Sequence, residues 1–237
     1  MSWIQRLYET YEHNANEVGR VGGEGEAVLL PICHSTQQAQ ITIVVNESGE
    51  FLRALVVPLE DRRTIIPCTE RSGSRAGSKP VNHPLCDKLQ YVAGDFLDFG
   101  GVVTSGFAKQ PIEPHEMYLA DLATWCESRY SHPKVCAVYA YVSKGQVIAD
   151  LVAHGLLHVD ASGKLLDKWD GSSEEPVPEI FQVLRTLQQQ DVFARWAVEI
   201  PGDPQTQLWT DKTVHESWSQ FYIASQSNPG LCYVTGE

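Results

Sequence analysis

The sequence predicts an α+β fold with a β-rich front and a helix-rich rear. Short runs of β-branched residues fill the first third of the chain, and amphipathic helical patterns dominate the second half. Hydrophobic residues make up 43% and charged residues 20% of the 237 residues, as in ordinary globular proteins. A chain of this length forms one large or two small domains. We therefore expect a β-rich lobe over residues 1–108 and a helix-rich lobe over residues 109–237.

The front of the chain begins with a helix and continues with strands. Trp3, Leu7 and Tyr11 recur at helical spacing, which predicts a helix from Ser2 to Asn14. Four β-branched runs then predict strands: AVLLPI (27–32), QITIVV (40–45), FLRALVV (51–57) and TIIPC (64–68). Turn residues at 46–49 separate the second and third runs, so we expect these two strands to form an antiparallel hairpin.

The rest of the chain predicts mainly helices. We expect them over residues 85–99, 112–130, 134–143, 147–155, 179–190 and 209–225. Ser131, His132 and Pro133 look like the cap and first turn of the third of these helices. Residues 193–200 and 230–237 predict strands, and a chain that stops at Glu237 directly after a β-branched run looks truncated.

Targeting signals and cysteine clusters are missing from the sequence. The longest unbroken apolar run is residues 135–142, whereas a bilayer span needs roughly 20 residues. The first residues carry Glu9 and Glu12 and lack the basic start of a signal peptide, so we expect a cytoplasmic protein with no membrane contact. Six cysteines occur without a C-x-x-C pair, which predicts reduced, mostly buried thiols.

One segment reverses the charge of the chain. Acidic residues outnumber basic ones by 30 to 18, giving a net charge of -12, yet residues 62–88 hold six Lys or Arg against two acidic residues. Within this segment, residues 69–84 (TERSGSRAGSKPVNHP) contain no apolar run and predict a long loop. Cations interleaved with Gly and Ser can approach phosphates closely. A solvated surface loop is the competing interpretation.

Residues able to support catalysis are scattered. His154 and His158 share helical spacing, but Gly155 interrupts them and no third ligand is near in sequence. His83 and Cys86 resemble a base and a thiol without a third, orienting group. The sequence contains none of the common nucleotide-binding, metalloprotease or serine-hydrolase motifs. We expect no catalytic residue, metal or cofactor, and a cysteine- or metal-dependent hydrolase ranks last among the hypotheses.

Two stretches of the chain resemble a known family. Residues 64–96 (TIIPCTERSGSRAGSKPVNHPLCDKLQYVAGDF) resemble the front of the large subunit of the type I-C CRISPR surveillance complex, Cascade. Residues 118–157 resemble the helical section of the same subunit, and GLCYVTGE at the end resembles a strand after which family members continue. The resemblance spans nearly all of this chain and less than half of a full-length subunit.

The resemblance implies a non-enzymatic role in antiviral defence. Such a subunit reads the protospacer-adjacent motif (PAM) in double-stranded target DNA, sits among guide-RNA complex subunits and helps to recruit a helicase-nuclease, while guide pairing reads the remaining sequence. The DNA contacts that it implies here are Arg71, Ser72, Ser74, Arg75, Lys79, Asn82 and Lys88. The cations among them would neutralise phosphates, and Asn82, with Ser72 or Ser74, would read base edges.

A second hypothesis remains beside DNA recognition. In it the chain is an acidic protein-docking subunit, and the basic loop serves assembly with neighbouring subunits. Phage-encoded inhibitors that mimic DNA would be drawn to the same basic loop by its charge.

Overall fold

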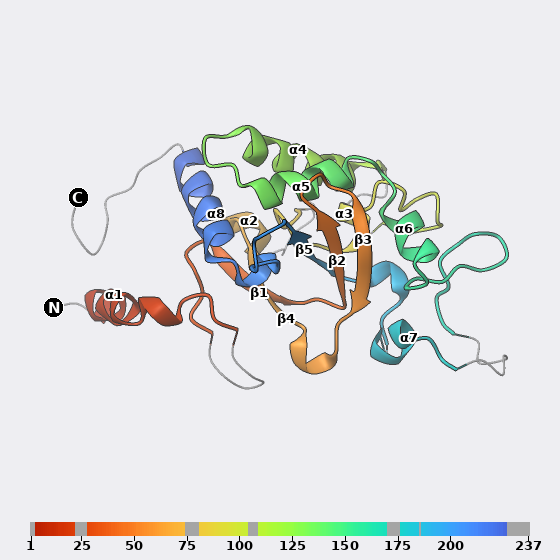
Figure 1. Cartoon of the computed structure of the whole chain (residues 1–237), viewed down its shortest axis with the longest axis horizontal. Coiled ribbons are helices and arrows are strands. Elements are labelled where there is room, and N and C mark those ends of the chain that lie inside the picture. The colour runs from red at the N-terminus through yellow and green to blue at the C-terminus, as the bar shows by residue number, and fades with distance from the viewer. Residues whose placement is uncertain are drawn as a thin grey trace.

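The computed structural model describes residues 3–21, 28–73, 81–103, 109–169, 176–184 and 186–226 (Figure 1). Its strands come mainly from the front of the chain, and most of its long helices come from the rear, which confirms the predicted α+β class. Helix α1 (Trp3–His13) lies at one end of the molecule and extends away from the body.

A three-stranded sheet forms the centre of the fold. Strand β2 (Ile41–Asn46) lies between β3 (Phe51–Val56), which pairs with it antiparallel, and β5 (Ala194–Glu199), which pairs with it in parallel. Ile43 stands opposite Ala54 on one side and Trp196 on the other. Because both faces of β2 are covered, its side chains from Ile41 to Val45 are buried, which explains why its sequence is a continuous apolar run.

A two-stranded sheet lies beside the central one. It pairs β1 (His34–Gln38) antiparallel with β4 (Arg63–Pro67). The central sheet also draws strands from both sides of the lobe boundary expected near residue 108, since β2 and β5 are neighbours in it. One core cluster likewise contains Ile43, Trp125 and Trp196, so sheet and core both continue across that boundary.

Helices from the rear of the chain cover the central sheet. Helix α5 (Pro133–Val142) packs against both β2 and β5, and α4 (Glu113–Glu127) packs against α5. The remaining helices are α2 (Glu70–Gly73), α3 (Leu89–Val92), α6 (Val147–Ala153), α7 (Glu179–Leu184) and α8 (Lys212–Ser225). Short 3-10 turns occur at Ala15–Glu17, Leu59–Asp61, Gln189–Asp191 and Leu208–Thr210.

Local capping explains where several helices begin and end. The ring of His132 accepts a hydrogen bond from the Lys134 amide at the start of α5, as the sequence predicts. Asp211 does the same for the Thr213 amide at the start of α8. Gly155 follows α6 with a φ of +75°, a conformation that glycine adopts without strain. These helices and the β2–β3 hairpin confirm the corresponding predictions.

Three element predictions differ from the structure, and a fourth falls outside the described residues. The described residues of the first predicted strand, 28–32, form no strand, whereas the polar run at β1 does, because it pairs with β4. The helix predicted over 85–99 shrinks to α3, and the one over 179–190 ends at Leu184. Leu85 cannot begin a helix in place, since its carbonyl accepts hydrogen bonds from the side chains of Tyr118 and Trp196. The strand predicted over 230–237 lies outside the described residues.

The described residues also test two other predictions, burial of the cysteines and the absence of a membrane-spanning segment. Cys86 is buried, whereas Cys33, Cys68, Cys126 and Cys136 are partly exposed and free, so burial of the thiols is less complete than expected. Within the described ranges, no single helix has the length and apolar composition needed to cross a bilayer. Helices α5 and α6 together reach that length, but they meet at an angle of 85°.

Candidate nucleic-acid interface

The basic segment enters through a short, hydrogen-bonded turn after β4. The Thr69 amide donates to the Ser72 hydroxyl over 2.8 Å, and the Ser72 amide donates to the Thr69 hydroxyl over 3.0 Å. This reciprocal pair satisfies amides that the first turn of α2 leaves without helical partners. The Glu70 amide donates to the Tyr222 hydroxyl over 3.0 Å, which fixes the turn to α8. The entry to the segment is therefore anchored.

The segment returns through a buried stretch, residues 82–87. Asp87 is fully buried and its carboxylate accepts hydrogen bonds from the amides of His83 and Lys88, over 2.7 and 2.8 Å. The Leu85 carbonyl accepts from the Tyr118 hydroxyl of α4 over 2.6 Å and from the Trp196 indole of β5 over 2.9 Å. Charge-assisted and buried bonds of this kind hold the backbone in one path. The described residues on either side, 69–72 and 82–88, are thus held by the fold.

The predicted contact residues fall into three groups. Arg71 is exposed on α2, and Lys88 is half-buried, with its ammonium 3.3 Å from the Asp191 carboxylate. Ser72 and Asn82 are buried at 2% and 3% exposure. The third group, Ser74, Arg75 and Lys79, lies outside the described residues.

Asn82 holds the segment against α4. Its amide donates to the Asp121 carboxylate over 2.9 Å, and this bond counteracts the burial that raises the pKa of Asp121. In this conformation the amide faces protein, and contact with a base requires it to leave Asp121. Base reading by Asn82 therefore stays an untested alternative to a purely positioning role.

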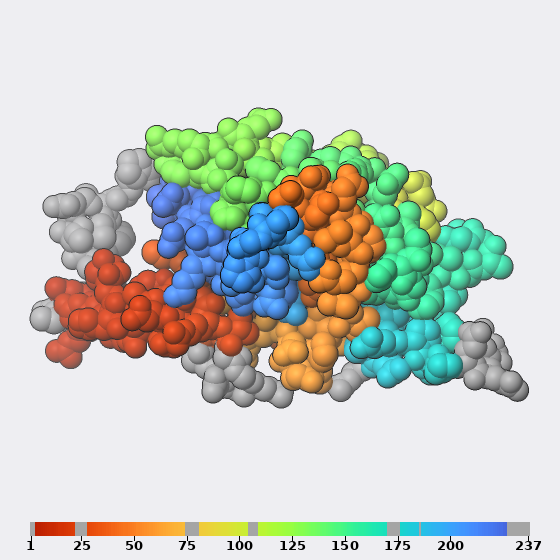
Figure 2. All heavy atoms as spheres, in the orientation of Figure 1, coloured from red at the N-terminus to blue at the C-terminus, as the bar shows by residue number. Residues whose placement is uncertain are grey.

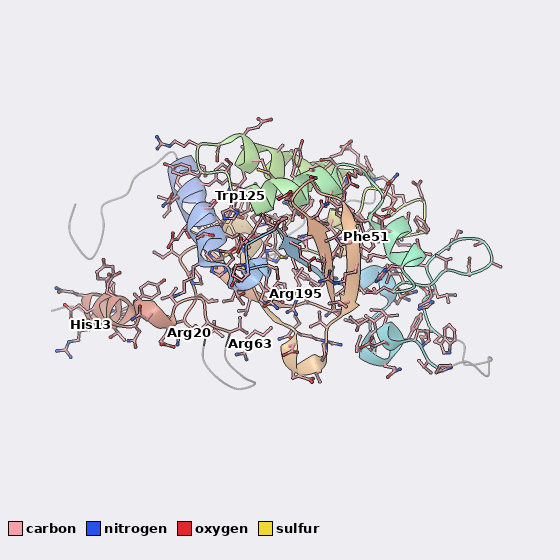
Figure 3. The ribbon with its side chains drawn as sticks, in the orientation of Figure 1. His13, Arg20, Phe51, Arg63, Trp125 and Arg195 are labelled. Carbon is pink, nitrogen blue, oxygen red and sulfur yellow. The ribbon has the colours of Figure 1, made fainter. Side chains whose placement is uncertain are left out.

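Two arginines, Arg62 of the basic segment and Arg195 of β5, are committed to the fold. Arg62 is buried and donates to the carbonyls of Val57 and Val183, over 3.3 and 2.7 Å. Arg195, labelled in the interior of the molecule in Figure 3, donates to the Thr42 hydroxyl over 2.9 Å. Its guanidinium lies 3.8 Å from the ring centre of Trp209. Such cations stabilise packing and cannot reach a phosphate from these positions. A count of charges along the sequence cannot separate them from surface cations, because both follow the same composition.

The alternative catalytic groups can be placed as well. Burial raises the pKa of Cys86 to about 12, so its thiol is protonated at neutral pH, which disfavours a nucleophilic role. Among the described residues, no three His, Cys, Asp or Glu side chains come together as metal ligands. His154 and His158 both lie beyond the end of α6, His154 exposed and His158 packed against Trp169 and Phe181.

Comparison with known proteins places the chain among CRISPR-associated proteins. The model of the family described as CRISPR-associated protein (Cas_Csd1) matches residues 7–237. The chain belongs to this Cas_Csd1 family, which is associated with the type I-C Cascade. A search of curated proteins gives no match. The family resemblance stated from the sequence is thereby confirmed.

Proposed function

We propose that this chain contacts the PAM of double-stranded target DNA through residues 69–88, as part of a non-enzymatic Cascade subunit. The observation that supports the proposal is a local cationic segment whose entry and exit are both tied to the fold, through Tyr222 and Asp121. Anchored ends limit the conformational entropy that the segment loses on binding. The contacts proposed for phosphates are Arg71, Arg75, Lys79 and Lys88.

The acidic charge of the rest of the chain confines DNA binding to the basic segment. Outside residues 62–88 there are 12 basic and 28 acidic residues, so most of the protein repels DNA. Binding to the phosphate backbone would therefore be local, and guide-RNA pairing would supply the affinity and sequence length that this chain lacks. We expect weak DNA binding by the chain alone and clear PAM preference only in the assembled complex.

Reversing the three loop charges tests the proposal. In the complex, the triple change Arg71→Glu, Arg75→Glu and Lys79→Glu should abolish PAM-dependent binding, because it replaces proposed phosphate contacts by carboxylates that repel DNA of any sequence. Each lost phosphate contact should also reduce the slope of log affinity against log salt by about 0.9. Fluorescence anisotropy on PAM and scrambled duplexes over a salt series measures this. The matched control reverses Lys109, Arg129 and Lys164, three exposed cations outside the segment, and should retain PAM preference.

The result also decides between DNA recognition and docking. If the loop variant joins the guide-RNA complex but loses DNA, the loop recognises DNA. If it fails to join while the control assembles, the basic loop serves assembly, as the docking hypothesis predicts. Unchanged assembly and unchanged PAM binding would contradict both.

A second prediction concerns Asn82 as a positioning residue. Asn82→Ala and Asp121→Asn both weaken the anchor between the segment and α4, so each should lower affinity for PAM and scrambled duplexes by the same factor. A loss of discrimination on the order of 1–3 kcal/mol at one PAM position, confined to Asn82→Ala, would instead show that its amide reads a base. The two variants are compared in the same anisotropy assay.

Recruitment of the helicase-nuclease is the other half of the proposed role. The acidic residues outside residues 62–88 can attract basic faces of such a partner. The same acidic residues repel free DNA. DNA-mimicking phage inhibitors would compete with target DNA at residues 69–88 by the same electrostatics. The proposal assigns no chemical turnover to this chain.

A further inference from the structure

Helix α1 carries a large apolar surface that the described parts of this chain leave uncovered. Trp3, Leu7 and Tyr8 are 74%, 60% and 51% exposed, and no side chain of the helix is buried. Figure 2 shows the helix projecting from one end of the molecule. A tryptophan with this exposure is unusual on a soluble surface and typical of the centre of protein interfaces.

The stability of α1 also points to a missing partner. Its 11 residues are fewer than the 12–15 that an isolated helix needs even for marginal stability in water. Its few ties to the body include a 3.1 Å hydrogen bond from the Tyr11 hydroxyl to the Leu30 carbonyl. Protein helices of this kind gain most of their stability from packing of the apolar face, which is exposed here.

A groove continues this apolar surface towards α8. It has a volume of about 330 Å³, and its lining includes Tyr11, Val18 and Pro31 together with Lys212, Glu216 and Gln220 of α8. Ile32, 59% exposed, stands at the same groove. The groove is therefore lined by the end of α1, through Tyr11, and by residues of α8, so an apolar partner on α1 can extend into it.

We propose that α1 and this groove receive an amphipathic helix from a neighbouring protein subunit of the complex. Helix α1 carries Arg6, Glu9 and Glu12, and the groove lining adds Lys212 and Glu216, so carboxylates outnumber Lys and Arg among these residues. This balance fits a partner helix with Lys or Arg beside its apolar side. It does not fit nucleic acid, whose phosphates the carboxylates repel, or an anionic membrane, whose surface helices are rich in Lys and Arg.

The inference rests on the proposed role as a subunit of an assembly, and it uses a surface separate from residues 69–88. Leu7→Glu tests it, with Leu59→Glu as the matched control, because Leu59 is 52% exposed on the turn at Leu59–Asp61. The probe is the set of the other protein subunits with guide RNA, and the readout is the affinity for the full chain, from titrated size-exclusion or biolayer measurements. Thermal unfolding of the isolated variants, with circular dichroism, verifies that both fold.

We expect Leu7→Glu to weaken incorporation at least about tenfold and Leu59→Glu to leave it unchanged, with both variants unfolding as the original chain does. Equal incorporation of both variants would overturn the inference. So would sedimentation data in which the chain alone dimerises through Leu7, or co-sedimentation with anionic phosphatidylserine vesicles that Leu7→Glu abolishes. Loss of PAM binding by the loop variant, measured in complexes that assemble normally, reports on the proposed function independently.

Discussion

Replacement of Lys134 by alanine is expected to lower the free energy of unfolding by about 3–5 kcal/mol. The side chain of Lys134 is 3% exposed, and its ammonium lies 2.6 Å from the Asp211 carboxylate and 2.8 Å from that of Asp203. Burial alone would lower the pKa of Lys134, but its hydrogen bonds to Asp203 and Asp211 raise it, so the side chain is charged in the fold. Removing it leaves the Asp211 carboxylate buried without its cation.

A surface ion pair serves as the control for this prediction. Lys144 lies 2.8 Å from the Glu50 carboxylate, but both side chains are well exposed, so Lys144→Ala should cost less than about 1 kcal/mol. Urea unfolding of the two variants measures the difference. The double change Lys134→Met and Asp211→Asn should recover part of the loss, because no unpaired charge is then buried. A cost for Lys134→Ala as small as that for Lys144→Ala would contradict the prediction.

Consequences of the Lys134 change should reach the candidate interface. Lys134 lies in the first turn of α5, and Asp211 caps α8, the helix whose Tyr222 anchors Glu70. Loosening the start of α8 therefore weakens one support of residues 69–88. Hydrogen exchange at the Glu70 amide should rise in Lys134→Ala and not in Lys144→Ala.

Acid is expected to destabilise the protein through a buried histidine pair. The rings of His34 on β1 and His215 on α8 lie 4.8 Å apart, and the two residues are 8% and 3% exposed. Burial, with the neighbouring His215, lowers the pKa of His34 to about 3, and burial lowers that of His215 to about 4. Asp211 and Lys212, the charged neighbours of His215, act on its pKa in opposite directions.

Acid lowers the free energy of unfolding because the unfolded chain takes up protons that the folded protein excludes. Above the unfolded pKa of about 6.5 both histidines are neutral in either state, and their contribution to stability is fully present. As the pH falls from 6.5 towards 4, the unfolded chain binds protons that the fold excludes, so stability decreases by about 1.4 kcal/mol per pH unit for each histidine. Chemical unfolding at a series of pH values measures the slope.

Substitution of His34 and His215 tests whether these two residues cause the dependence of stability on pH. The double change His34→Gln and His215→Gln should remove the share of the slope that these two histidines contribute, whereas His13→Gln, at an exposed position on α1, should leave the slope unchanged. Burial also lowers the pKa values of His115, His132 and His158, which keep their share in both variants. Ring titration in the intact protein by nuclear magnetic resonance tests the same point without a variant. Native pKa values near 6.5 for both rings would contradict the prediction.

The sequence predicted elements well where local pattern and burial agree. The β2–β3 hairpin, the helices α4, α5, α6 and α8, and strand β5 follow from period-2 or helical spacing with matching turns and caps. It failed where a distant contact overrides local preference. The sequence of β1 is polar and typical of a loop, but it forms a strand because β4 pairs with it. Leu85 lies outside the helix expected there because the side chains of Tyr118 and Trp196 donate hydrogen bonds to its carbonyl.

The candidate site divides in the same way. Charge contrast along the sequence located the cationic segment, because charge contrast is a property of neighbouring residues. The family came separately, from the resemblance of residues 64–96 and 118–157 to it. Burial separated the members of the cationic segment: Arg71 is exposed, Asn82 is bound to Asp121, and Arg62 is committed to the core. The sequence does not show which residues become buried or which partners they contact, because both depend on the folded structure.

The amino-acid sequence by itself determined the α+β class, the helix-forming pattern of α1 and the position of the basic segment. Only the tertiary structure decided that β5 joins β2, that Lys134 and Asp211 are buried together, and that the apolar side of α1 is exposed. The physical reason is the separation in sequence over which each interaction acts. Propensity, capping and charge density act between neighbours in the chain, whereas sheet order, burial and ion pairing depend on residues brought together only by folding.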